Sequence, residues 1–186
     1  MEKFDRIDTG RLRLHGLGFL QLQLAGNRRL HVWHPDLPKR RCFEFSKVHN
    51  HRFSFTAEVL IGTQWNVRCL VESDPNGEWT KYYHEGPRNE HGSRPWIPDG
   101  TVTITPGIVE SIPAGSSYTS EMFEYHFTAV TGNPVVTLLT KREEDKSRGA
   151  HSTCHNCAEP DVDFNGSQLP QSRLWEIFQD ALKYGN

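Results

Sequence analysis

The sequence of 186 residues contains no apolar run of the roughly 20 residues that a membrane-spanning helix needs. It also lacks an excess of charge of one sign, because 21 Lys and Arg face 23 Asp and Glu. This balance gives no basic footprint for nucleic acid or an anionic membrane. The N-terminal residues MEKFDRIDTGRLRLHG are charged and lack the apolar core of a signal peptide. We therefore expect a cytoplasmic protein with neither nucleic acid nor membrane as a partner.

Cysteine is scarce, and reduced thiols are the default state in an intracellular chain. Cys154 and Cys157 nevertheless have the CxxC spacing of zinc knuckles and redox pairs, with His151 and His155 beside them. The sequence has no second CxxC, and a structural zinc ion needs four ligands. Inert thiols are the main interpretation. A structural zinc site and a redox pair are the alternatives.

Aromatic residues are abundant, with 10 Phe, 5 Trp and 5 Tyr, and they can supply a modest core. Apolar and polar residues alternate in many short segments, as at residues 20–24, which is the period of a half-buried strand. Regularly spaced short strands separated by Gly and Pro turns are typical of an all-β sandwich or barrel. The expected strands cover residues 20–24, 30–33, 42–45, 49–59, 64–71, 81–84, 101–105, 108–112, 117–122, 125–130 and 135–140.

We expect a β domain over residues 1–140, with a loop-rich insertion at about 73–100 that is rich in Pro and Gly. A tail over residues 141–186 begins with a charged stretch and an irregular segment. Leu174, Ile177 and Phe178 then recur at helical spacing, which predicts a helix over about 173–184. Ser172 is the expected N-cap and Gly185 the expected C-cap.

The sharpest local pattern is His49-Asn50-His51. Residues i and i+2 of a strand share one face, so the two imidazoles can converge on one metal ion. A third ligand has to come from another segment. His126 is the best candidate, because it lies in the strand-like segment at residues 123–128.

These residues resemble the motifs of the cupin superfamily. The first cupin motif has an HxH pair and a later glycine, which Gly62 matches at the eleventh position after His51. The second motif runs glycine, five residues, proline, one residue, glycine, two residues, histidine. Starting it at Gly115 places His126 at the histidine position, with Glu121 and Phe123 in place of the proline and the second glycine. Starting it at Gly107 matches Pro113 and Gly115 but places Tyr118 at the histidine position. Over most of its length the chain is similar to uncharacterised cupin-like proteins of bacteria and phages. The resemblance implies a jelly-roll β-sandwich with a short C-terminal helix.

The chain departs from the first cupin motif in one ligand. The motif usually carries a Glu four or five residues beyond its second histidine, where this chain has Phe55 and Thr56. The remaining three-histidine set resembles that of thiol dioxygenases such as cysteine dioxygenase, which also lack the Glu. Members of that group with a Cys–Tyr crosslink have a Cys near the position of Thr56. Glu124 is the leading substitute ligand, since alternation puts it on the face of His126.

Four further residues near these motifs have two interpretations each. Tyr118 is either a hydrogen-bond donor behind the site or a core residue. Arg52 either binds a substrate anion or belongs to a solvated face. Phe53 and Phe55 line the core and form the apolar wall of a pocket if one exists.

We therefore expect His49, His51 and His126 to hold one divalent ion, with Fe(II) favoured and Zn, Mn or Ni open. The resemblance implies a mononuclear non-haem iron dioxygenase acting on a small molecule. Neutral ligands leave the ion its full charge, which favours anionic substrates. The alternatives are a non-catalytic cupin that binds a sugar or nucleotide, and a zinc-dependent isomerase or hydrolase. Strand edges can pair, so a homodimer is also expected.

Overall fold

The computed structural model describes residues 12–185, and the first eleven residues, on which part of the signal-peptide argument rests, lie outside them. Every strand pairing in these residues is antiparallel. The elements are β1 (Arg13–His15), β2 (Phe19–Gln23), β3 (Arg28–Trp33), the 3₁₀ helix η1 (Phe43–Phe45), β4 (Phe53–Ile61), β5 (Thr63–Ser73), β6 (Trp79–His84), β7 (Ile97–Pro113), β8 (Ser117–Ser120), β9 (Tyr125–Val130), β10 (Val135–Glu144), β11 (Ala150–His155) and α1 (Gln171–Lys183).

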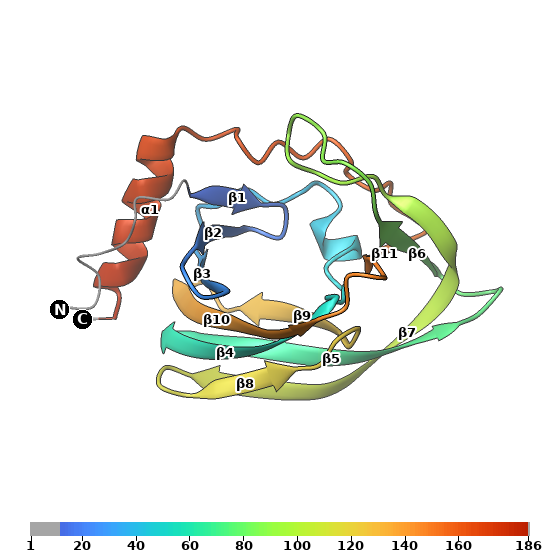
Figure 1. Cartoon of the computed structure of the whole chain (residues 1–186), viewed down its shortest axis with the longest axis horizontal. Helices are drawn as coiled ribbons and strands as arrows, with labels where there is room; N and C mark the ends of the chain where they lie inside the picture. Colours follow the sequence, from blue (N-terminus) through green and yellow to red (C-terminus); the bar gives the residue numbers. More distant parts are fainter. Residues whose placement is uncertain (1–11, 186) are drawn as a thin grey trace.

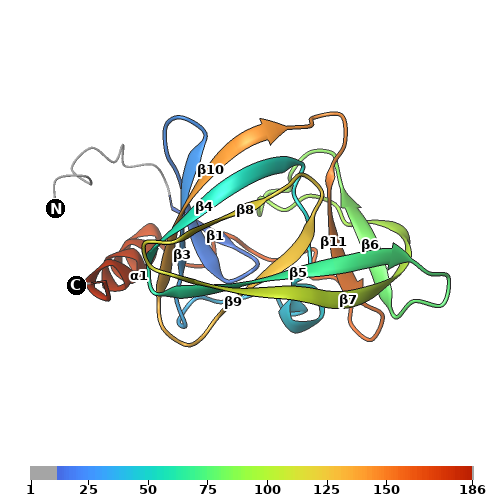
Figure 2. The ribbon, with the colours of Figure 1, turned by 90° about the horizontal axis from the view of Figure 1, so that it is seen from below.

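The strands form two sheets that face one another, with α1 at the end of the molecule opposite β6 and β11 (Figures 1 and 2). The first sheet has the order β1-β2-β3-β10-β4-β8, and the second has the order β11-β6-β7-β5-β9. The expected all-β sandwich with a C-terminal helix is confirmed. Neither helix in residues 12–185 has the length and apolar character needed to cross a bilayer.

The second sheet closes on itself through the segment at residues 48–51, which we call the HxH segment. His49 and His126 of β9 exchange two main-chain hydrogen bonds, with N–O distances of 3.0 and 2.9 Å. On its other side the segment bonds β11, because the Asn50 amide donates to the His151 carbonyl at 2.9 Å. The Thr153 amide donates back to Val48 at 3.0 Å. The two outer strands of the sheet are therefore joined by the residues that carry the HxH pair.

Two apolar cores hold the layers together, one on each face of the first sheet. Leu30 and Val32 of β3 point outward into the core beneath α1, where Leu174, Ile177 and Phe178 are buried. Burying one such side chain contributes about 2 kcal/mol. The second core lies between the sheets and contains Trp33, Phe53, Phe55, Val59, Ile112 and Leu139. The two-residue period of the strands thus fixes which side chains face the interior.

Several local predictions are wrong, each for a physical reason. The strand expected at residues 42–45 is η1, because hydrogen bonds of the i→i+3 type run from Arg40 to Phe43 and onward to Ser46. The strand expected over residues 49–59 begins at Phe53, since residues 49–51 pair with the other sheet. The Pro106-Gly107 turn is a bulge inside the single long strand β7, where the pairing register with β5 shifts.

The chain after residue 140 is also more regular than expected. β10 continues to Glu144, and the segment expected to be irregular begins with β11, which pairs with β6. Residues 73–100 contain the end of β5, all of β6 and the start of β7. The predicted helix is present, but Pro170 occupies the N-cap in extended conformation and Tyr184 the C-cap. Proline at the helix start costs no hydrogen bond, because the amides of the first turn have no helical acceptor.

Candidate metal centre

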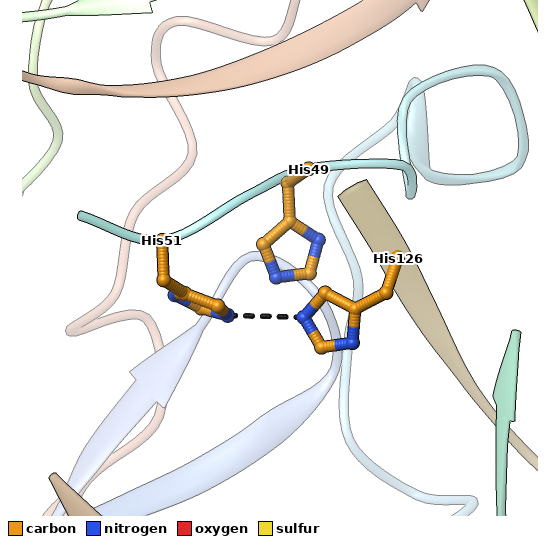
Figure 3. Close-up of side chains that lie close together, drawn as sticks. All are labelled: His49, His51 and His126. Atoms are coloured by element: carbon orange, nitrogen blue, oxygen red, sulfur yellow. Dashed lines mark hydrogen bonds between the residues drawn. The ribbon is translucent and has the colours of Figure 1, made fainter. Parts of the chain in front are cut away.

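His49, His51 and His126 come together between the two sheets, with their rings turned toward one another (Figure 3). One ring nitrogen of each lies within 4.8 Å of the others, and His51 Nε2 lies 3.1 Å from His126 Nε2. Within residues 12–185 no other group of three or more His, Cys, Asp or Glu residues converges in this way. The structure therefore brings together the three histidines selected from the sequence.

Main-chain hydrogen bonds hold the three histidines in position. Besides the reciprocal pair between His49 and His126, the Phe123 amide donates to the His51 carbonyl at 2.7 Å. Phe123 has a left-handed backbone, with φ of 62°, and turns the chain into β9. Both ends of the HxH pair are thus tied to the segment that carries the third histidine. The site is preorganised by the backbone.

Hydrogen bonds also fix which ring nitrogen of two histidines carries the proton. His49 Nδ1 lies 2.9 Å from the Lys47 carbonyl, which only accepts, so Nδ1 donates and Nε2 keeps its lone pair. His126 Nδ1 lies 2.8 Å from Asn66 Oδ1. Asn66 Nδ2 donates to Glu110 at 3.1 Å, which leaves Oδ1 as the acceptor facing His126. His126 Nε2 therefore also presents a lone pair, the form in which imidazole binds a metal.

Burial keeps the three imidazoles neutral near pH 7. It lowers the pKa of His49 to about 4, partly offset by the hydrogen bond to Lys47. It lowers the pKa of His51 and of His126 well below the usual 6.5, and the neighbouring histidines lower both further. No carboxylate belongs to the converging group. The cluster thus offers three neutral nitrogen ligands.

The spacing of the nitrogens suits a shared ion. Metal–imidazole bonds are about 2.1 Å long, so two nitrogens on one ion lie at most about 4.2 Å apart. The His51–His126 separation of 3.1 Å meets this limit directly. The widest separation is at most 4.8 Å, so it meets the limit after a movement of less than about 1 Å. The residues present therefore fit a single divalent ion.

Phe53 and Phe55 belong to the core between the sheets and lie beside the cluster. The ring centroids of Phe53 and Phe55 are 4.9 and 5.4 Å from that of His51. Tyr118 packs behind Phe55 at 5.9 Å, and its hydroxyl accepts a hydrogen bond from Gln64 Nε2 at 2.7 Å. Burial raises the pKa of Tyr118 to about 12. Its contacts are those of a buried core tyrosine.

Arg52 and Glu124 lie outside the converging group. Arg52 Nε donates to Glu144 at 2.9 Å on a half-exposed surface. Glu124 forms an ion pair with Arg68 and accepts from Ser120 Oγ at 3.1 Å. The alternation argument for Glu124 does not apply, because this residue lies in the turn before β9.

The CxxC residues do not converge on a common point. Cys154 is buried next to Cys42, whereas Cys157 is exposed. His151 Nε2 lies 3.0 Å from Asp99, and His155 Nδ1 accepts the Cys157 amide at 3.1 Å. These four side chains therefore do not form a shared set of ligands, and the interpretation of the cysteines as inert thiols stays a prediction.

Sequence reasoning missed the residues that orient His126. Asn66 accepts the hydrogen bond of His126 Nδ1, Glu110 accepts from the Asn66 amide, and Arg68 in turn binds Glu110 at 3.0 Å. The one sequence signal for this role is that Asn66, a polar residue, occupies an inward-facing position of β5. It becomes informative only once the register of β5 with β9 and β7 is known.

Comparison with known proteins adds no relative: no family model matches the chain, and no curated protein matches it. The fold is a curled antiparallel β-sandwich with three histidines close together, an arrangement compatible with a cupin-like fold.

Proposed function

We propose that the protein is a cupin-like metal-dependent enzyme, a mononuclear non-haem iron dioxygenase acting on a small molecule. The observation that carries the proposal is the convergence of three neutral imidazoles, two with an Nε2 lone pair fixed by hydrogen bonds. Three such ligands from one protein leave positions on an ion for substrate and O2. The sequence motifs give a second line of support, because a three-histidine set of this kind occurs in the cupin family that they resemble.

Each part of the site has a distinct task in this proposal. His49, His51 and His126 hold the ion, and a bound Fe(II) supplies the redox chemistry that activates O2. The Lys47 carbonyl and the Asn66 amide hold two of the rings in the ligating tautomer. Phe53 and Phe55 keep one side of the site apolar. Since no carboxylate joins the ligands, the ion keeps its full positive charge and favours an anionic substrate.

The first experiment is elemental analysis of protein purified without a polyhistidine tag and reconstituted anaerobically with Fe(II). We expect about one iron per chain in the wild type and none in a variant with all three histidines changed to alanine. His91→Ala is the control, because this histidine lies in the loop between β6 and β7 and outside the cluster. Cys154→Ser with Cys157→Ser should keep its metal.

The second step separates the oxygenase from the alternatives. Iron-loaded protein should consume O2 in the presence of members of an anionic small-molecule library, and zinc-loaded protein should not. Zinc as the metal found after expression, together with turnover that does not need O2, would replace the dioxygenase by an isomerase or hydrolase. Absence of any metal after reconstitution would leave a non-catalytic ligand-binding protein.

A further inference from the structure

The inner face of the first sheet is polar where it approaches the metal centre. In β3, Leu30 and Val32 face the core beneath α1, so Arg29 and His31 face the interior. The same alternation in β10 places Leu139 in the interior core and Lys141 beside it. A sheet face that encloses a core normally carries apolar residues. Here Arg29, His31 and Lys141 place hydrogen-bonding nitrogen atoms on this face instead.

Two of these residues, Arg29 and Lys141, contact an aromatic ring that also contacts one of the three histidines. Lys141 Nζ lies 4.1 Å from the centroid of Phe53, and Arg29 Cζ lies 5.5 Å from it. Phe53 in turn packs against His51, with 4.9 Å between ring centroids and the two rings tilted by 36°. The ring of Phe53 is therefore in contact both with the two cations and with His51.

The positive charge at this place is only partly compensated. The nearby carboxylate is Glu144, which lies 3.8 Å from Lys141 Nζ and 2.9 Å from Arg52 Nε. Arg29 donates Nε to Gln23 at 3.1 Å, and its terminal nitrogens have no hydrogen-bond partner among residues 12–185. The three cations Arg29, Lys141 and Arg52 therefore have one carboxylate, Glu144, near them. The cluster therefore keeps a net positive charge, which attracts an anion.

His31 adds a donor without a partner. Its Nε2 atom is buried and makes no hydrogen bond within residues 12–185. A buried polar atom without a partner costs free energy, so an occupied site would satisfy it. Burial and the charge of Arg29 lower the pKa of His31 to about 3, so the ring is neutral and can donate through one nitrogen.

We propose that Arg29, Lys141 and His31 bind the oxyanion of the substrate, a carboxylate or phosphate group, and direct the rest of the molecule across Phe53 to the metal centre. Arg29 supplies a planar pair of donors that matches either oxyanion, and Lys141 supplies a point charge. The inference rests on the proposed function, because it names the substrate class of that same site.

The test is calorimetric titration with sodium phosphate and with sodium acetate at constant ionic strength. The wild type should bind at least one probe saturably, and the stronger probe identifies the preferred oxyanion. The variant with Arg29→Gln and Lys141→Gln should bind it about tenfold more weakly or worse, the loss expected for charged hydrogen bonds. Repeating the titration in the three-histidine alanine variant excludes direct binding of the probe to a metal.

A matched control is the variant with Arg28→Gln and Arg142→Gln. These neighbours lie on the opposite strand faces, where Arg28 bonds Ala25 and Arg142 pairs with Glu121 at 3.0 Å. The control has the same net charge as the test variant, so it should bind like the wild type. Equal binding by both double variants, or no saturable binding by the wild type, would overturn the inference.

Metal content of the same proteins separates this inference from the proposed function. If the Arg29→Gln, Lys141→Gln variant binds iron but no longer binds the anion, the result supports both the iron site and the anion site. Iron with unchanged anion binding overturns only the inference. A wild type without metal that binds the probes through Arg29 and Lys141 overturns the enzyme and retains the anion site.

Discussion

Replacing Asn66 by alanine tests whether the tautomer of His126 matters for metal binding. The change removes the acceptor that lies 2.8 Å from His126 Nδ1 and leaves a buried N–H without a partner. Loss of such an outer partner typically lowers metal affinity by about 10–100-fold, which is about 1.4–2.7 kcal/mol. We expect this loss with all three histidines still in place. The measurement is competition for Zn²⁺ or Fe²⁺ against a chromophoric chelator.

Gln64→Ala is the matched control for this experiment. Gln64 lies two residues before Asn66 on the same face of β5 and is also buried, but its amide bonds Tyr118. Both variants should lose about 1–3 kcal/mol of stability, because each leaves a buried polar group unpaired. Only Asn66→Ala should lose metal affinity. Equal affinities for the two variants would refute the role assigned to Asn66.

Three further predictions concern pH and stability. Because burial lowers the pKa of His49 to about 4 in the folded chain, protons bind the unfolded state first and stability should fall as pH drops from about 6.5 toward 4. Urea unfolding across that range checks this, and the alanine variant of the three ligands should show a shallower slope. Tyr118→Phe should cost about 1–3 kcal/mol in the same assay with metal content unchanged, since Gln64 loses its acceptor. Phe178→Ala should cost about 3–5 kcal/mol by opening the core beneath α1, and a loss below about 1 kcal/mol would contradict that packing.

Local patterns predicted much of the fold and the three histidines that converge in it. Two-residue alternation identified β2, β3 and β9, and helical spacing identified α1. Gly62 of the first motif has φ of 78° at the turn between β4 and β5, where a Cβ would lie 2.5 Å from the Pro134 carbonyl. The HxH spacing works without a regular strand, because residues 49 and 51 still share a face in an extended backbone.

What the sequence left open depends on contacts between distant segments. The HxH segment is hydrogen-bonded to β9 on one side and to β11 on the other. The local sequence of residues 150–155 does not indicate a strand, because its pairing partner lies about 100 residues earlier in the chain. The Pro106-Gly107 pair has the composition of a turn, yet pairing with β5 absorbs it as a bulge. The expected homodimer stays a prediction, with β1 and β8 as the outer strands of the first sheet.

X-ray absorption by the iron-loaded protein shows which atoms coordinate the metal. If His49, His51 and His126 hold the ion, the spectrum should show nitrogen neighbours at about 2.1 Å with the outer-shell scattering of imidazole. The Asn66→Ala variant, reconstituted at higher metal concentration, should give the same ligand set. A sulfur neighbour near 2.3 Å, or a shell without imidazole scattering, would place the metal outside the three-histidine cluster.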